Sequence, residues 1–527
     1  MTRDFQLPGR SPVIASDGMA ATSHPLATQT AVETLRAGGT AADAAVAALG
    51  VLCVVEPHMT GIGGDCFCIV AKPDTPVWGY NGSGRAAAAI RMEALAGQGP
   101  GYIAGNSVHA ITVPGAIEAW AAILAAHGRF SLDRALAAAI HYAEDGFPVA
   151  PRIAYDWALQ AVRLREDPGA ARHYLVGGSA PAAGDVIRLP ALAATLKTIA
   201  AHGPRAFYEG PVAEDIIATL KPRGSFLALD DLAGHCGDVV APIATNYRGL
   251  DILELPPSGQ GLTALVLLNI LEQFDLAALD PAGPERFHIA LEAARLAYAL
   301  RDREIADPDY MRTAVPALLD KGMARELANG IDRSRRLALP AAPMRGSDTV
   351  YLTVVDRDRM AVSLINSLFS QFGVGICTEK SGIMLHNRGA CFVVDQAHPN
   401  CIGPGKRPMH TIIPAVAMRN GRCDMPFGVM GAHYQPMGHA QLVTNIVDYG
   451  MDVQAAIDAP RAFFAGTASI VERGVPPSTI AGLKRLGHEL VEAPSPWGGG
   501  QAIRIDWDRG VLIGGSDPRK DGAAMGY

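Results

Sequence analysis

An irregular loop runs directly into a β-rich segment in the stretch GSDTVYLTVVD, Gly346–Asp356. The residues just before it, 334–345, contain Pro and Arg without a periodic apolar pattern, whereas Val350–Val355 is typical of a strand. A cut between Asp348 and Thr349 would leave Thr349 with an attacking hydroxyl and its own base, the new α-amine, whose unperturbed pKa is roughly 7.7–8.0. An ordinary strand that begins with Thr explains the same pattern, so other parts of the chain have to decide between the two interpretations.

The pattern of secondary structure changes at Thr349, from mainly helical before it to short β-rich runs after it. We expect helices at 24–36, 41–51, 115–126, 132–143, 189–201, 212–220, 261–274 and 284–300, and again at 438–448, 453–458 and 477–486. We expect strands at 67–71, 239–255, 353–356, 361–365, 382–385, 411–418, 425–430, 502–506 and 510–513.

This layout predicts an α+β protein. A helix-rich part, residues 1–348, ends in a mobile linker at about 332–348, and a sheet-rich part, residues 349–527, begins with Thr349. Both parts can contribute to one joint core, in which case the boundary between them is covalent rather than structural.

The composition excludes several classes of protein. Of the 527 residues, 49% are hydrophobic and 18% are charged, which is typical of a well-buried globular chain. A net charge of −7 without any basic block argues against nucleic-acid binding. No apolar run approaches the ~18 residues of a membrane span, and the first residues lack the apolar core of a secretory signal. The eight Cys show no paired spacing, so we expect a cytoplasmic protein with reduced thiols.

Motifs for nucleotides and metals are incomplete. The run Gly61–Cys66, GIGGDC, lacks the third glycine of a dinucleotide fingerprint and the Gly-Lys-Ser/Thr of a P-loop. His433 and His439 are adjacent neither on a strand nor on one helical turn, and they lack a third ligand. We therefore expect neither a cofactor nor a metal.

A set of short motifs, taken in order, is more informative than any one of them. The set consists of Ala21–Ala27, Gly38–Ala47, Val55–Gly64, Val113–Gly115, Val354–Asp358, Phe372–Gly375, Gly405–Pro408 and the tail Asp517–Tyr527. Together these motifs resemble the γ-glutamyltransferase family over nearly the whole chain.

The resemblance implies an N-terminal-nucleophile hydrolase, which is a four-layer αββα sandwich made as a proenzyme. Such a proenzyme cuts itself into a large and a small subunit that form the sandwich jointly; here they would be residues 1–348 and 349–527. Counting back along the strand from Val354–Asp356 places the family's catalytic threonine on Thr349. The scissile bond is then the one between Asp348 and Thr349.

Three further roles follow from the resemblance. The family's second threonine, which supports the nucleophile by a hydrogen bond, corresponds to Ser367. The two backbone N–H donors of the oxyanion hole fall near Tyr434 and Gln435, although the family has consecutive glycines there. Backbone donors tolerate a change of side chain, because amide dipoles stabilise the charge.

The chain departs from the family where the substrate binds. The family's glutamyl motif corresponds to Asn387–Phe392, NRGACF, in which Cys391 replaces a carboxylate that would pair with the glutamyl ammonium and Arg388 adds a cation. The paired serines that hold the α-carboxylate become His410 and Thr411. A pocket with cations and no anion favours an anionic amide, since a buried unpaired ammonium costs several kcal/mol.

One more cation is a candidate for the substrate site. The family's carboxylate-binding Arg aligns with Ser83, and Arg85 stands two places on, in a Gly-rich loop. Arg85, Arg388, His410 and Thr411 are therefore the predicted substrate-binding residues. The alternatives are an interface or surface Arg at 388 and a structural hydrogen-bonding role for His410.

The predicted function is hydrolysis of a small anionic amide through an acyl-enzyme on Thr349. Among family members without the glutamyl motif, the chain is similar to the oxamate amidohydrolase type of purine-ureide breakdown, which yields oxalate and ammonia. The alternatives are a γ-glutamyl hydrolase or transferase, a glutaryl-lactam acylase, and an uncleaved, inactive homologue. The expected partners are the two subunits of one precursor and a second heterodimer, with no nucleic acid and no membrane.

Overall fold

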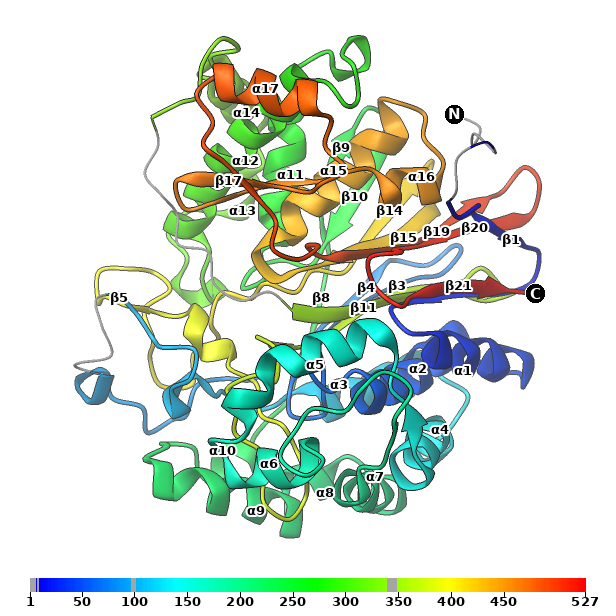
Figure 1. Ribbon diagram of the computed structural model, residues 1–527, viewed down its shortest axis with the longest axis vertical. Helices are drawn as coiled ribbons and strands as arrows, with labels where there is room; N and C mark the ends of the chain where they lie inside the picture. The colour runs from blue at the N-terminus through cyan, green and yellow to red at the C-terminus, as the bar shows by residue number, and fades with distance from the viewer. Residues whose placement is uncertain (1–5, 7–8, 96–100, 339–347) are drawn as a thin grey trace.

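The protein is a sandwich of two seven-stranded sheets between two layers of helices (Figure 1). The computed structural model describes residues 6, 9–95, 101–338 and 348–527. The two sheets contact each other through β2, β11 and β12 on one side and β15, β19 and β20 on the other. The α+β class and the four-layer αββα order predicted from the sequence are confirmed.

The first sheet holds the junction segment at its centre. Its strands, in spatial order, are β21 (Ala523–Gly526), β2 (Met19–Thr22), β11 (Asp348–Val355), β12 (Ala361–Phe369), β3 (Asp65–Ala71), β4 (Trp78–Asn81) and β8 (Asp238–Val240). β11 pairs antiparallel with β2 on one side and with β12 on the other. The β-branched and apolar side chains of Val350–Val355 are all buried, as expected of a central strand.

The second sheet is also built from both parts of the chain. Its strands, in spatial order, are β1 (Val13–Ala15), β20 (Val511–Ser516), β19 (Gly499–Asp506), β15 (Arg422–Met430), β14 (Ala415–Arg419), β10 (Leu250–Glu254) and β9 (Ile243–Tyr247). Both sheets thus combine strands that precede Thr349 with strands that follow it, and the two parts of the chain share one core.

Helices cover the outer face of each sheet (Figure 1). Against the first sheet lie α1 (Pro25–Arg36), α2 (Ala41–Val55) and α3 (Ala116–His127); against the second lie α11 (Gly261–Leu271), α15 (Gln435–Val447) and α16 (Val453–Asp458). Every residue of α2 is buried, and its small Ala side chains let it pack on α1, α4 (Leu132–Asp145) and β11. A capping box of Thr40 and Asp43 begins it.

The remaining elements extend these layers. They are α5 (Pro151–Leu164), α6 (Pro168–Tyr174), α7 (Pro190–His202), α8 (Arg205–Tyr208), α9 (Pro211–Leu220), α10 (Leu229–Ala233), α12 (Pro284–Glu304), α13 (Val315–Leu318), α14 (Lys321–Asn329), α17 (Pro477–Arg485), and the short strands β5 (Gly101–Tyr102), β6 (Phe147–Pro148), β7 (Val186–Ile187), β13 (Val393–Val394), β16 (Ala462–Ala465), β17 (Ala468–Val471) and β18 (Leu490–Glu492).

Two expected elements are wrong or too long, and six helices, α5, α6, α8, α10, α13 and α14, were not expected. Residues 382–385 form no strand: Gly382 has φ +67°, and only isolated bridges occur, at Met384 and Leu385. The strand expected at 411–418 begins only at Ala415, after Pro414, whose nitrogen cannot donate to a ladder. Helix α5 was not expected, because its apolar residues lie on more than one face.

The expected linker at 332–348 is described only in part. Residues 339–347 lie outside the described residues, but those before them are held in place. Arg336 N donates to Leu486 O at 2.7 Å, and Leu337 N donates to Glu292 Oε2 at 2.7 Å. The described start of this segment is therefore anchored to α12 and to the end of α17.

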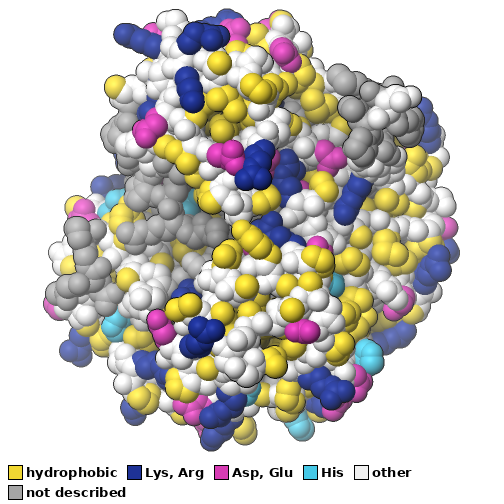
Figure 2. Space-filling model, viewed as in Figure 1, with side chains coloured by type: hydrophobic (Ala, Val, Ile, Leu, Met, Phe, Trp, Pro, Cys, Tyr) yellow, Lys and Arg dark blue, Asp and Glu magenta, His cyan; other side chains and the backbone are white. Residues whose placement is uncertain are grey.

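The surface is mixed in charge. On the face shown in Figure 2, Lys and Arg side chains lie scattered among apolar and acidic ones. Among the described helices, none combines the length and the apolar character needed to cross a bilayer.

Close packing between the sheets predicts one sensitive glycine. A Cβ on Gly428 would lie 2.5 Å from the Tyr351 ring of the facing sheet. That ring is fully buried and its hydroxyl is hydrogen-bonded to Ser363 Oγ at 2.8 Å, so it cannot easily move. We expect Gly428→Ala to cost about 1–3 kcal/mol through overpacking and to lower the thermal midpoint. Gly9→Ala, which meets nothing within 4 Å, is the control, and equal midpoints for both variants would contradict the expectation.

Candidate active site

Thr349 lies at the start of β11 and contacts the predicted supporting residue. Its Oγ1 is 2.9 Å from Ser367 Oγ, and both side chains are fully buried. Ser367 Oγ also accepts a hydrogen bond from Phe369 N–H at 2.8 Å. The β11–β12 register shifts between Asp348 and Val350, and such a bulge re-aims the side chain it contains. The structure thus brings together the two hydroxyls that the sequence had paired.

A buried carboxylate, which sequence reasoning missed, lies beside this pair. Asp65 on β3 is in register with Ser367 on β12. Asp65 Oδ2 accepts from His410 Nε2 at 3.0 Å and lies 3.3 Å from His386 Nδ1, while Oδ1 accepts from Gly84 N–H at 3.1 Å. Burial would raise the pKa of Asp65, but the two histidines hold it well below its usual value. Its place directly after Gly63 and Gly64 is the only signal in the sequence that could have found it.

Arg388 enters the same cluster from the short helical turn Arg388–Cys391. Its side chain is fully buried, its Nη1 donates to Thr411 Oγ1 at 2.6 Å, and its guanidinium lies 4.5 Å from the centre of the Phe369 ring. Nε is 4.0 Å from Asp65 Oδ2, and neither Nε nor Nη2 donates a hydrogen bond to any of the described residues. Burial lowers the pKa of this guanidinium, which nevertheless stays charged at neutral pH. Arg388, His410 and Thr411 therefore form one cluster, with two N–H donors of a buried cation left for a ligand.

Arg85 is placed differently from Arg388. Its side chain is 44% exposed and lies 3.7 Å from Asp307 and 3.9 Å from Asp238, and its Nη1 donates to Gly405 O at 3.1 Å. It lines a separate surface pocket of about 210 Å³ that also contains Asp230 and Asp231. The structure therefore does not bring Arg85 into the Arg388 cluster.

The turn before α15 corrects the expected oxyanion hole. Tyr434 N–H donates to Gly431 O at 2.9 Å, and Gln435 N–H donates to Ala432 O. Both donors are consumed by the first helical turn, so the assignment to Tyr434 and Gln435 is wrong. Gly431 and Ala432 precede that turn, and their N–H groups are not used by it. They have φ values of +124° and +47°, and positive φ at a buried Ala is strained backbone of a kind common at functional sites.

One group of possible metal ligands was not foreseen from the sequence. His288, Glu292 and His488 place their ligand atoms within 4.8 Å of one another. His288 Nδ1 is hydrogen-bonded to His488 Nε2 at 2.8 Å, and His288 Nε2 donates to Asp332 O at 2.8 Å. Glu292 accepts from Arg295 at 2.8 Å as well as from the Leu337 amide. These hydrogen bonds account for the group as an anchor of the 332–337 segment.

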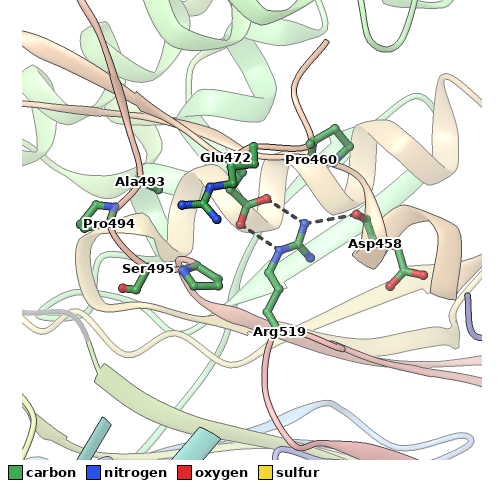
Figure 3. Close-up of a pocket in the computed structure, with 10 residues that line it drawn as sticks. Asp458, Pro460, Glu472, Ala493, Pro494, Ser495 and Arg519 are labelled. Atoms are coloured by element: carbon green, nitrogen blue, oxygen red, sulfur yellow. Dashed lines mark hydrogen bonds and ion pairs between the residues drawn. The ribbon is translucent and has the colours of Figure 1, made fainter. Parts of the chain in front are cut away.

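A larger pocket lies outside the cluster (Figure 3). It has a volume of about 340 Å³ and is lined by Asp458, Pro460, Glu472 and Arg519 among others. Arg519 points at Glu472, with Nε–Oε1 and Nη2–Oε2 distances of 2.8 Å each (Figure 3). The Arg519 and Glu472 charges of this pocket thus neutralise each other, whereas Arg388 has N–H groups that donate no hydrogen bond to the described residues.

Comparison with known proteins identifies the family. The family model described as gamma-glutamyltranspeptidase matches residues 27–527. The chain belongs to the γ-glutamyltranspeptidase family. This establishes the fold and the general chemistry together, since the match covers Thr349, Ser367 and every residue of the Arg388 cluster.

Relatives in the γ-glutamyltranspeptidase family carry several specificities. The chain is 38% identical to the glutathione hydrolase-like YwrD proenzyme of Bacillus subtilis, over 98% of this chain and 99% of that protein. It is 36% identical to the oxamate amidohydrolase proenzyme of Klebsiella pneumoniae, again over 98% and 99%. Among solved structures, the crystal structure of a cephalosporin acylase from Bacillus halodurans matches with a TM-score of 0.93 and 37% identity, over 100% of this chain and 99% of that one. The chain is accordingly a hydrolase of C–N amide bonds.

The buried histidines predict how stability depends on pH. Burial is the main cause that lowers the pKa of His410 to about 3 and the pKa values of His24 and His235 to about 4. Histidines in the unfolded chain have a pKa near 6.5, so below that pH the unfolded state binds more protons than the folded state. Stability should therefore fall as the pH decreases from about 6.5 to 4, and thermal midpoints at pH 7.5 and 5.0 measure it. The low pKa of Asp65 places its own loss of stabilisation below this window.

Matched variants separate the histidine effect from general acid sensitivity. His235→Gln should flatten the pH dependence, because one buried neutral ring is removed. His202→Gln, at an exposed position, should leave the dependence unchanged. Equal slopes for His235→Gln and the parent chain would contradict the attribution.

Proposed function

We propose that the chain cuts itself between Asp348 and Thr349 and that Thr349 then hydrolyses a small amide that carries a carboxylate, with oxamate as the best candidate. The observation that carries the proposal is the fully buried Arg388, whose Nε and Nη2 have no acceptor among the described residues. The cytoplasmic location and the dimer of heterodimers stay predictions from the sequence.

The reaction follows from the groups around Thr349. Its hydroxyl attacks the amide carbon and gives its proton to the new α-amine, which serves as base. The negative charge on the carbonyl oxygen develops beside N–H donors, for which we assign Gly431 and Ala432 in place of Tyr434 and Gln435. The amine then protonates the leaving ammonia, and water attacks the ester with the same amine as base.

Short contacts support a small substrate. Thr349 contacts Ser367, Ser367 is hydrogen-bonded to Phe369, and the Phe369 ring carries the Arg388 guanidinium. The cation is thus linked to the proposed nucleophile through three contacts and two intervening residues, Ser367 and Phe369. In oxamate the carboxylate is bonded directly to the scissile carbonyl carbon, so a cation near the nucleophile suits it better than an acid with a long spacer.

A second candidate is an acylase for a longer anionic acyl group, which the cephalosporin acylase similarity favours. A γ-glutamyl substrate fits less well. Its ammonium would meet Arg388 and the buried Cys391, and the Asp65 carboxylate of the cluster is already engaged by His410, His386 and the Gly84 N–H.

The first test of the proposal is maturation. Intact mass after purification should show two fragments, residues 1–348 and 349–527. Thr349→Ala should remain one inactive chain, because one hydroxyl serves both cleavage and turnover, whereas Thr353→Ala on the same strand should still be cut. An uncut parent that hydrolyses an amide would contradict the mechanism, and an uncut parent without activity would favour the inactive homologue.

The second test is the charge of the pocket. Arg388→Gln should reduce kcat/KM for oxamate about tenfold or more, since a charge-assisted hydrogen bond worth roughly 1.5–3 kcal/mol is lost. Arg85→Gln should have a smaller effect, because Arg85 is half-exposed and already contacts Asp307. Self-cleavage should survive in both variants. If Arg388→Gln turns over oxamate at the parent rate, or if the parent prefers γ-glutamyl anilide or a glutaryl-lactam, the oxamate proposal is wrong.

A further inference from the structure

Gln260 joins two segments of the candidate site with one side-chain amide. It is fully buried at the start of α11. Its Nε2 donates to Thr411 O at 2.7 Å and to Ala432 O at 2.8 Å. Both N–H groups of the amide are therefore used, one on each segment. Thr411 belongs to the Arg388 cluster, and Ala432 belongs to the turn that precedes α15.

The orientation of this amide is fixed by Arg301. Arg301 Nη1 is 2.9 Å from Gln260 Oε1 and 2.9 Å from His433 Nδ1. A guanidinium can only donate and a carbonyl oxygen can only accept, so Gln260 must present its oxygen to Arg301 and its nitrogen to the two carbonyls. The same reasoning gives His433 the tautomer whose Nδ1 is an acceptor. Arg301 is itself buried on α12 and cannot swing away without losing these contacts.

Each of three successive carbonyls of the turn accepts a hydrogen bond. Gly431 O accepts from Tyr434 N–H, Ala432 O accepts from Gln260 and Gln435, and His433 O accepts from the Tyr298 hydroxyl. In a trans peptide the C=O of one residue and the N–H of the next point in opposite directions. Fixing the carbonyl of Gly431 therefore fixes the direction of the Ala432 N–H, one of the two assigned donors. Fixing the carbonyl of Ala432 fixes the direction of the His433 N–H and holds in place the turn that also carries the Gly431 N–H.

The side chains that donate to these carbonyls lie before Thr349 in the sequence, whereas the carbonyls lie after it. Gln260, Arg301 and Tyr298 precede Thr349, whereas Thr411 and the turn follow it. Gln260 is also tied to the second segment by its backbone, because Gln260 N donates to His410 O at 2.8 Å and His410 N donates to Ser258 O at 2.9 Å. Gln260 is therefore held by its backbone as well as by its side chain.

We propose that Gln260, oriented by Arg301, is a positioning residue: by holding Ala432 O and Thr411 O, it keeps the turn that carries the Gly431 and Ala432 N–H donors in place relative to the Thr411–Arg388 anion site. The inference rests on the proposed function, because it assigns the turn to the oxyanion and the Arg388 cluster to the carboxylate. Without the Gln260 side chain, the N–H donors of the turn and the Arg388 cluster are both still present, but they are no longer aligned with each other. The transition state, which contacts both sets of groups, is then less stabilised, whereas binding of a ground-state anion, which contacts only Arg388, is not weakened.

The test separates kcat from anion binding. Gln260→Ala removes the amide, and Gln260→Glu keeps its size but sets a carboxylate against two carbonyl oxygens. We expect kcat for oxamate, per cleaved molecule counted by intact mass, to fall about tenfold to a hundredfold in both variants, as misplacement of about 1 Å or loss of an oxyanion donor does. The inhibition constant of oxalate, a competing anion, should change less than about threefold, well below the tenfold that one charge-assisted contact contributes.

Gln454 supplies the matched control. It is another buried Gln whose amide bonds the backbone of a neighbouring strand, with Nε2 donating to Ser516 O at 2.9 Å and Oε1 accepting from Ser516 N–H at 3.0 Å; Nε2 also donates to Asp458 Oδ1 at 2.8 Å. Gln454→Ala should lower the thermal midpoint as Gln260→Ala does, with kcat within about twofold of the parent, since lost stability alone leaves the folded site intact.

Each outcome decides the matter. If kcat of the Gln260 variants falls no more than kcat of Gln454→Ala, the inference is overturned. It is also overturned if the oxalate inhibition constant rises by the same factor by which kcat falls, because the whole site is then disrupted. Folded Gln260 variants that stay uncut also overturn it, because the residue then acts in maturation. If the parent hydrolyses a glutaryl amide instead of oxamate, the proposed substrate fails, and the same comparison with glutarate as the competing anion still tests Gln260.

Discussion

The antiparallel pairing of β11 with β12 is the constraint on which the rest of the site depends. It holds Thr349 against Ser367, and the pairing of β12 with β3 then brings Asp65 into register with Ser367. Three neighbouring strands thus supply the proposed nucleophile, its hydrogen-bond partner and the buried carboxylate. Because backbone ladders set these positions, the relative placement of the side chains is determined by the core of the sheet and not by mobile loops.

Buried charge gives this arrangement its chemistry. Asp65 shares its oxygens between His410, His386 and the Gly84 amide, so that little of its acceptor capacity is left for Arg388 at 4.0 Å. A guanidinium enclosed in protein with two unused donors is unfavourable until an anion arrives. Under the proposed function, this arrangement would trade some stability of the ligand-free protein for affinity toward a carboxylate, and it would penalise a substrate that brings a second cation.

The architecture was predicted well from the sequence, because it depends on local patterns, and Thr349 as the nucleophile stays a prediction that the same local pattern suggested. The strand Val350–Val355 and its distance from Asp356 are local, and they located Thr349 and, through the family resemblance, Ser367. The oxyanion donors were misplaced, because deciding which N–H groups the first turn of α15 consumes requires the position where the helix begins. Arg85 and Arg388 were both predicted from the sequence to bind substrate, and their different surroundings could not be seen there, since side-chain direction depends on Asp307 and Asp65, which are distant along the chain. Asp65 and Gln260 were missed for the same reason: each acts through partners that only the folded chain brings near.

Because each sheet combines strands from both parts of the chain, the two fragments would stay together after cleavage. In the first sheet the β11–β12 hairpin lies between β2 and β3, and in the second sheet β20, β19, β15 and β14 lie between β1 and β10. A nick at the junction would sever one covalent bond and leave every ladder in place. The two fragments would then be insensitive to dilution and unable to swap partners between molecules. Assembly would be a single irreversible event, completed while the polypeptide is still continuous, so that an inherited defect in one fragment could not be rescued by supplying a sound copy of it later.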